Sequence, residues 1–140
     1  MAFDRSAVSP RITCLLTGET ESTAEALEER LASDGIGLLG LVPTGVEALG
    51  LLQQRATTAI IIDVRLPDLS GIEVARRAVE IVRRQSFVIL RTSAPDAGIA
   101  AQALDAGARG VVLQNGGHST LLEALSQAAA GRIYVDPALR

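Results

Sequence analysis

An apolar run that ends on a carboxylate constrains the fold of this chain more than any other feature. Residues 59–62 are Ala-Ile-Ile-Ile, and this β-branched composition favours a strand that is buried on both faces. Asp63 follows the run directly, Pro67 prevents the strand from continuing, and Gly71 permits a backbone shape that other residues resist. In open α/β sheets, ligands bind beyond the carboxyl ends of the strands. We therefore expect Asp63 to lie in a functional site.

Four further apolar runs alternate with helical patterns along the chain. We expect strands near residues 12–16, 38–42, 87–90 and 110–114, each followed by a helix. Ser119 or Thr120 is expected to cap the last helix, and Gly131 to end it. Such alternation predicts a parallel sheet with helices on both faces. The pattern by itself leaves both a flavodoxin-like and a Rossmann strand order open.

Composition restricts the function more than the fold. The 140 residues are 48% hydrophobic but only 2% aromatic, so the core of a single domain must consist of Leu, Ile, Val and Ala. A formal net charge of −3 argues against nucleic-acid binding by this domain itself. No apolar run is long enough for a membrane span, and residues 1–10 lack the apolar region of a signal peptide. All 13 basic residues are Arg, so no Lys is available to any site.

Polar side chains follow four of the expected strands at the point where each strand ends. They are Glu19, Asp63, Thr92 and Gln114. In a flavodoxin-like sheet these strand ends meet near one pocket, so the four groups would converge. Each also has a simpler interpretation, such as a helix-capping or solvated carboxylate for Asp63 and a structural hydrogen-bonding group for Gln114.

Three segments together resemble a known family, the receiver domain of two-component response regulators. They are the Asp63–Pro67–Gly71 spacing, Ala-Leu-Asp-Ala-Gly-Ala-Arg-Gly at 103–110, and Gly-Arg-Ile-Tyr-Val-Asp-Pro at 131–137. The last two are similar to the NarL/LuxR type. The resemblance implies a flavodoxin-like (CheY-like) α/β fold, a doubly wound (βα)5 domain with a five-stranded parallel sheet in the order 2-1-3-4-5. It also divides the chain into a flexible leader (1–10), a receiver domain (11–131), and a C-terminal tail or start of a linker to an output domain (132–140).

The resemblance assigns roles to individual residues. Asp63 would be the phosphoacceptor, and it would bind Mg²⁺ together with Glu19 and the backbone carbonyl of Arg65. Oxygen ligands of this kind suit Mg²⁺. Thr92 would contact the phosphoryl group and move with it, and Ser93 would control access to it.

The sequence departs from the family pattern at several of these positions, which makes the site degenerate. The first acid of the metal-binding pair falls on Gly18, so Mg²⁺ binding would be weak or absent. The phosphoryl-binding Lys falls on Gln114, which carries no charge, and the aromatic switch residue falls on Val111. Arg91 precedes Thr92, and alternation along the strand should direct it away from Thr92's side of the sheet. On this reasoning Arg91 does not replace the missing charge.

The function implied is that of a signal-input domain in the bacterial cytoplasm, not of an enzyme. A histidine kinase would phosphorylate Asp63 and so control a helix-turn-helix DNA-binding output domain, with a homodimer as a further expected form. One alternative is an atypical pseudo-receiver that acts through protein or ligand binding without phosphorylation. Another is an aspartyl-nucleophile phosphohydrolase, which the presence of Arg65 at the usual second-acid position weakens.

Overall fold

A computed structural model describes residues 12–18, 28–82 and 86–140 of the chain. The expected leader at 1–10 and the expected metal ligand Glu19 lie outside the described residues. Residues 28–33 are helical and belong to the first helix that the sequence predicts.

The strands form one parallel sheet. They are β1 (Ile12–Thr17), β2 (Ile36–Val42), β3 (Ala59–Asp63), β4 (Phe87–Thr92), β5 (Gly110–Leu113) and β6 (Tyr134–Val135). Their order across the sheet is β2-β1-β3-β4-β5-β6. The predicted flavodoxin-like order 2-1-3-4-5 is therefore confirmed, and a short sixth strand extends the sheet beyond β5.

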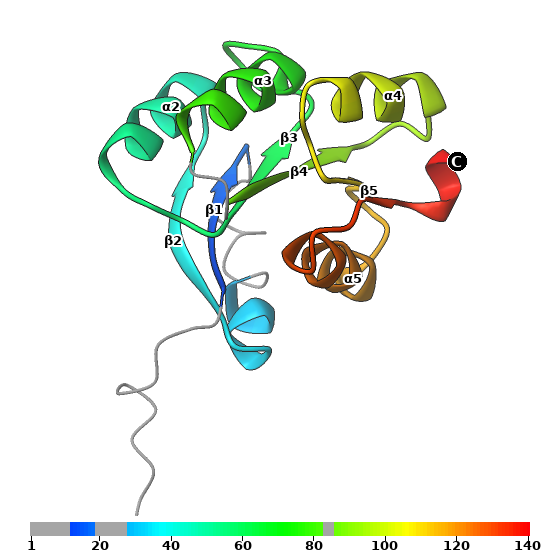
Figure 1. The fold of residues 1–140 in the computed structure, drawn as a ribbon, viewed down its shortest axis with the longest axis horizontal. Helices are drawn as coiled ribbons and strands as arrows, with labels where there is room; N and C mark the ends of the chain where they lie inside the picture. The colour runs from blue at the N-terminus through cyan, green and yellow to red at the C-terminus, as the bar shows by residue number, and fades with distance from the viewer. Residues whose placement is uncertain (1–11, 19–27, 83–85) are drawn as a thin grey trace, which may run out of the picture.

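The helices cover both faces of this sheet, as the alternating pattern predicts (Figure 1). They are α2 (Gly45–Gln54), α3 (Gly71–Ile81), α4 (Ala97–Asp105) and α5 (His118–Ala129), with a 3-10 turn, η2, at Pro137–Leu139. One face carries α2, α3 and α4, whereas α5 and the helical residues 28–33 cover the other.

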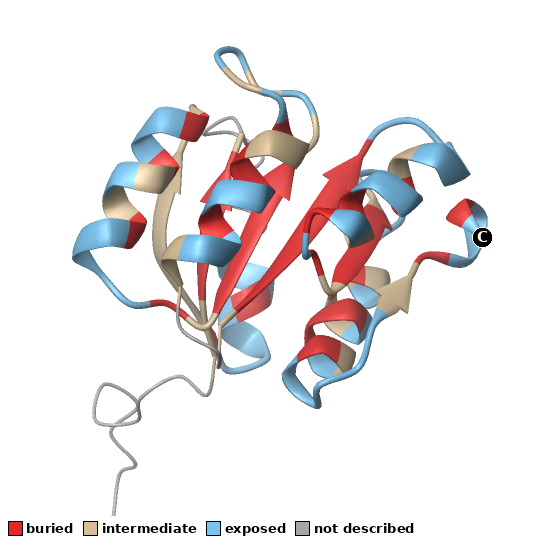
Figure 2. Ribbon diagram, turned by 45° about the horizontal axis from the view of Figure 1, so that its top comes forward, coloured by how far each residue is buried: buried red, intermediate tan, exposed pale blue. Residues whose placement is uncertain are grey.

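The central strand β3 is buried throughout, which explains its run of branched side chains (Figure 2). Ile60 and Ile62 pack with α2, α3 and α4 on one face, and Ile61 packs with α5 on the other. Because successive side chains of a strand point to opposite faces, the apolar run fills both halves of the core. Asp63 is the last residue of this rigid strand.

The loop after β3 is held by polar contacts that the sequence pattern only partly indicates. Ser70 caps α3 by accepting a hydrogen bond from the backbone N–H of Ile72. A β-carbon on Gly71 would overlap the carbonyl oxygen of Asp63, so glycine is required here by close backbone approach. Asp68 accepts hydrogen bonds from the first backbone amides of α2. These contacts fix the segment that follows Asp63.

The start of α5 corrects one prediction. The helix begins at His118, and its N-cap residue is Gly117, which makes no side-chain cap. Neither Ser119 nor Thr120 is the cap, because both lie inside the helix; the Thr120 hydroxyl instead donates to the carbonyl of Gly116. Gly117 has a φ of +94°, a backbone region that favours glycine.

The C-terminal residues pack onto the sheet. Val135 of β6 pairs with Val111 of β5, and Leu139 is 2% exposed within the core on the α4 side. Asp136 is buried, and its carboxylate accepts hydrogen bonds from the backbone amides of Leu113 and Ala138. Residues 134–139, which the sequence assigned to a tail or linker, are thus continuous with the sheet.

Candidate functional site

The candidate site is centred on Asp63, at the carboxyl end of β3. The residue is 6% exposed, so its carboxylate is largely removed from water. Burial raises the pKa of Asp63 from its usual value of 3.8 to about 7. A buried carboxylate needs a partner for its charge.

Arg91, on the neighbouring strand β4, supplies the partner. Its Nε donates to Oδ1 of Asp63 at 2.9 Å, and its Nη2 lies 2.9 Å from the same oxygen. Arg91 is itself only 7% exposed, and burial lowers its pKa to about 10. The two residues face each other in the parallel register of β3 and β4, which places both side chains on one face of the sheet. The sequence-based inference that Arg91 cannot bring a positive charge to the site is therefore wrong.

Gly18 closes the other side of the carboxylate. It follows β1 with a φ of +105°, and a β-carbon there would lie 2.7 Å from Oδ2 of Asp63. A side chain at this position would collide with the carboxylate, so in this conformation the acid expected in the family has no room. The two oxygens of Asp63 thus have different surroundings, with a guanidinium at Oδ1 and a glycine backbone beside Oδ2.

Four other predicted site residues, which the structure describes on β4 and β5 or just beyond them, make other contacts. The buried Thr92 hydroxyl accepts a hydrogen bond from the backbone N–H of Ala94 and donates to its carbonyl. Ser93 and Gln114 are exposed, and the backbone N–H of Gln114 donates to the carbonyl of Thr92. Val111 is fully buried within β5. The predicted phosphoryl-contact and switch roles of these four residues stay predictions.

The described residues do not by themselves complete a divalent metal site, and the predicted ligand Glu19 lies outside them. The receiver domains that the sequence resembles generally bind Mg²⁺ at the phosphorylation site. Across 12–18, 28–82 and 86–140, no three His, Cys, Asp or Glu side chains gather closely enough to hold an ion. The carboxylate of Asp63 is already paired with Arg91. Arg65 is exposed and forms an isolated antiparallel β-bridge with Ser70, and the predicted role of its backbone carbonyl as a metal ligand stays a prediction. A dication beside Asp63 would be repelled by the guanidinium unless Arg91 moved.

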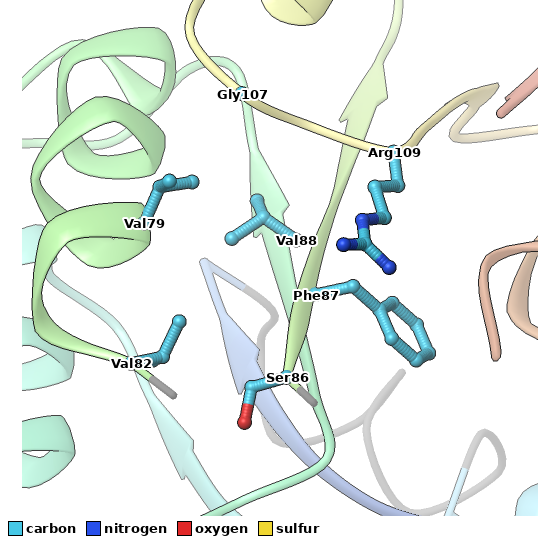
Figure 3. A pocket seen from close by; sticks show the side chains of 7 residues that line it. All are labelled: Val79, Val82, Ser86, Phe87, Val88, Gly107 and Arg109. Carbon is cyan, nitrogen blue, oxygen red and sulfur yellow. The ribbon is translucent and has the colours of Figure 1, made fainter. Parts of the chain in front are cut away.

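A cavity of about 410 Å³ lies near the amino end of β4, away from Asp63 at the carboxyl end of β3 (Figure 3). Ser86 and Phe87, at the start of β4, line it together with Arg109, Val79 and Val82. The side chains of Phe87 and Arg109 point to one side of β4, and Val79 of α3 and Val82, just after it, approach from the other side. Because Asp63 is at the carboxyl end of the strands, this cavity has no part in its chemistry.

The fold agrees with comparisons to known proteins. Residues 15–126 match the family model of the response regulator receiver domain, so the chain belongs to that family. It is similar to the transcriptional activator protein ExaE of Pseudomonas putida, with 34% identity over 109 residues covering 75% of this chain and 50% of the relative. It is also similar to the probable transcriptional regulatory protein NarL of Mycobacterium tuberculosis, with 29% identity over 107 residues, 76% of this chain and 49% of the relative. The chain thus spans about half the length of these curated relatives.

Solved structures support the fold assignment. A two-component response regulator of the LuxR family from Aurantimonas sp. SI85-9A1 matches with a TM-score of 0.84 at 21% identity, covering 91% of each chain. A CheY-like receiver domain protein from Methanospirillum hungatei JF-1 matches with a TM-score of 0.76 at 19% identity, covering 86% of this chain and 94% of the other. At these identities the likeness shows the fold alone. Within the described parts of the chain, no helix has the length and apolar character needed to cross a membrane.

Proposed function

We propose that this chain is the signal-input domain of a cytoplasmic transcriptional response regulator, in which Asp63 accepts a phosphoryl group from a histidine kinase. The family and the names of its relatives as transcriptional regulators support this role. In this proposal the DNA-binding helix-turn-helix part and any homodimer belong to the full regulator. The domain passes on a signal and does not turn over a substrate.

The observation that carries the proposal is the position of Asp63, the last residue of the buried central strand in a receiver fold. In the phosphoryl transfer, a carboxylate oxygen of Asp63 attacks phosphorus and a P–O bond forms. The bond from phosphorus to the donor breaks, and the leaving group keeps the electron pair. When the donor is a phosphohistidine, the bond that breaks is P–N, and the imidazole nitrogen takes a proton from solvent. The guanidinium of Arg91, 2.9 Å from Oδ1, is a cation beside the charge that arrives.

The raised pKa of Asp63 gives the reaction a defined pH dependence. Only the ionised carboxylate is a nucleophile, and burial raises its pKa to about 7. We therefore expect the rate of phosphorylation by a small donor such as acetyl phosphate to rise as pH increases through about 7 and to level off above it. Initial rates measured by intact-protein mass spectrometry across this range would check the expectation.

A direct test of the proposal uses acetyl phosphate and phosphoramidate as donors. The wild-type protein should gain the mass of one phosphoryl group, and the Asp63→Asn variant should gain none. Chemical reduction of the acyl phosphate in the protein, followed by peptide mapping, should place the modification on Asp63. No modification of the wild type by either donor or by a histidine kinase, with and without Mg²⁺, would refute phosphoacceptor function.

A second candidate function is favoured by the low exposure of the Asp63 carboxylate. Asp63 is 6% exposed, paired with Arg91 at one oxygen and close to Gly18 at the other. Such a site fits a pseudo-receiver that signals through protein or ligand contacts without phosphorylation. The same donor experiment separates the two functions, because this candidate requires that the folded wild-type protein stays unmodified.

A further inference from the structure

The charge arrangement around Asp63 differs from what a metal-dependent acceptor site requires. In such a site, several carboxylates share a dication. Among the residues that the structure describes, the carboxylate of Asp63 instead faces the guanidinium of Arg91, and no cluster of three metal-binding side chains is present. The carboxylate of Asp63 thus has the guanidinium of Arg91 as a cationic partner at Oδ1.

The guanidinium occupies one particular oxygen. Both Nε and Nη2 of Arg91 lie 2.9 Å from Oδ1 of Asp63, so two nitrogens of the guanidinium converge on that atom. Oδ2 lies beside Gly18, at a distance that leaves no room for a β-carbon. A cation approaching the carboxylate would therefore meet the guanidinium at one oxygen and the backbone of Gly18 beside the other.

The backbone holds this pair in place. Asp63 and Arg91 are register partners in β3 and β4, and the N–H of Val64 donates to the carbonyl of Arg91 at 2.8 Å. Both side chains are at most 9% exposed. The contact therefore joins two rigid central strands, unlike a surface pair on mobile side chains.

We propose that Arg91 is the resident cation of the Asp63 site and takes the place at Oδ1 that a divalent metal would need. The positive charge that the sequence lacks at Gln114, on the strand-five side, is supplied from β4 instead. The negative charge of Asp63 consequently has a cationic partner without a metal ion, and the guanidinium of Arg91 disfavours metal binding at this carboxylate. This inference concerns the same carboxylate as the proposed function, but it does not depend on phosphorylation.

The test measures metal binding directly. Mn²⁺ is titrated into the isotopically labelled protein, and paramagnetic broadening of the amide signals of Val64 and Arg91 is followed, with Mg²⁺ as a diamagnetic competitor. The wild type should show no saturable broadening at these amides at millimolar metal. The Arg91→Gln variant should bind Mn²⁺ at least about tenfold more tightly, because the carboxylate has lost its competing cation. Arg77→Gln, which removes an exposed guanidinium from α3, is the matched control and should behave as the wild type.

Two results would overturn the inference: saturable binding of Mg²⁺ at Asp63 in the wild type, or equal metal affinity in the wild type and in Arg91→Gln. If Arg91→Gln does not fold, Arg91→Lys replaces it, and the retained charge should keep the site closed to metal. Phosphorylation then separates this inference from the proposed function. Modification that strictly requires Mg²⁺ overturns the inference and leaves Asp63 as the acceptor. A wild type that is never modified but excludes Mn²⁺ as expected supports the inference while the acceptor function fails.

Discussion

The ion pair between Asp63 and Arg91 makes a quantitative prediction about stability. Replacing Arg91 by Gln leaves a buried carboxylate without its cation, and removing one partner of a buried pair typically costs about 3–5 kcal/mol. The full cost requires that both groups be charged. Burial raises the pKa of Asp63 to about 7 and lowers that of Arg91 to about 10, so both are charged between these values. We expect the interaction to be strongest near pH 8.5.

At lower pH the interaction should weaken. Near pH 5.5 the carboxyl of folded Asp63 is protonated, and Arg91 then makes only a charge-assisted hydrogen bond with a neutral group. A double-mutant cycle of Asp63→Asn and Arg91→Gln should therefore give a coupling energy of about 1–2 kcal/mol near pH 5.5 and about 3–5 kcal/mol near pH 8.5.

The same pKa sets the sign of the wild-type pH dependence. Because the folded pKa of Asp63 is raised from 3.8 to about 7, its contribution to stability is present below 3.8 and is lost as pH rises through 7. At about 1.36 kcal/mol per pKa unit, the loss amounts to about 4 kcal/mol. The Asp63→Asn variant lacks this loss, so the stability difference between wild type and variant should change by about this amount between pH 4 and pH 8.

Urea denaturation followed by circular dichroism measures these energies. The matched control is Arg77→Gln, because Arg77 pairs with Glu73 at 3.0 Å while their side chains are 55% and 44% exposed. An exposed pair of this kind is worth about 0.5 kcal/mol or less at any pH. Equal costs for Arg91→Gln and Arg77→Gln, or a coupling energy that does not grow between the two pH values, would refute the reasoning.

Three further predictions test the surroundings of the pair and the C-terminal segment. Gly18→Ala should destabilise the fold by about 2–4 kcal/mol in thermal or urea unfolding, from a strained backbone and a β-carbon 2.7 Å from Asp63 Oδ2; an unchanged stability would contradict this. Leu139→Ala should lower the free energy of unfolding by about 2–4 kcal/mol because this side chain is 2% exposed. The control Ile133→Ala, at a side chain that is 64% exposed, should lower it by about 0.5 kcal/mol or less. Similar values for both variants would show that residues 134–139 are not part of the folded unit. Backbone hydrogen bonds from α2 lower the pKa of Asp68, so the stabilisation by its carboxylate is present above the usual pKa and is lost on acidification below it. Asp68→Asn should remove this pH-dependent stabilisation and speed amide hydrogen exchange at the start of α2. Unaltered exchange would argue against stabilisation of α2 by Asp68.

The sequence predicted the sheet because its signal is local and repeated. The run at 59–62 predicts a strand that is buried on both faces, and Ile60 and Ile61 do lie in opposite halves of the core. The strand order followed from a family resemblance, since alternation alone fits more than one order. The sixth strand was missed because two residues, Tyr134 and Val135, are too few for a periodic pattern.

The contact between Asp63 and Arg91 could not be predicted from alternation along one strand. Alternation relates Arg91 only to its neighbour Thr92, whereas the contact depends on the register between β3 and β4. A one-residue change of register would move Arg91 to the face opposite Asp63. The signal that could have found it was composition, because an Arg that directly follows four apolar residues in a central strand needs a buried partner.

Two departures from the family pattern at this site, Gly18 and Gln114, are linked by charge. An acid at position 18 would add a second negative charge at a point where even a β-carbon lies 2.7 Å from Asp63 Oδ2, and such a pair would require a dication. With glycine at that position, the described part of the site carries one carboxylate, which a single guanidinium neutralises. A Lys at the place of Gln114 would bring a second cation to the end of the sheet where Arg91 already lies. The loss of an acid and of a Lys is therefore consistent with a site whose charge is balanced from β4, and removing Arg91 should disturb it more than any change at Gln114.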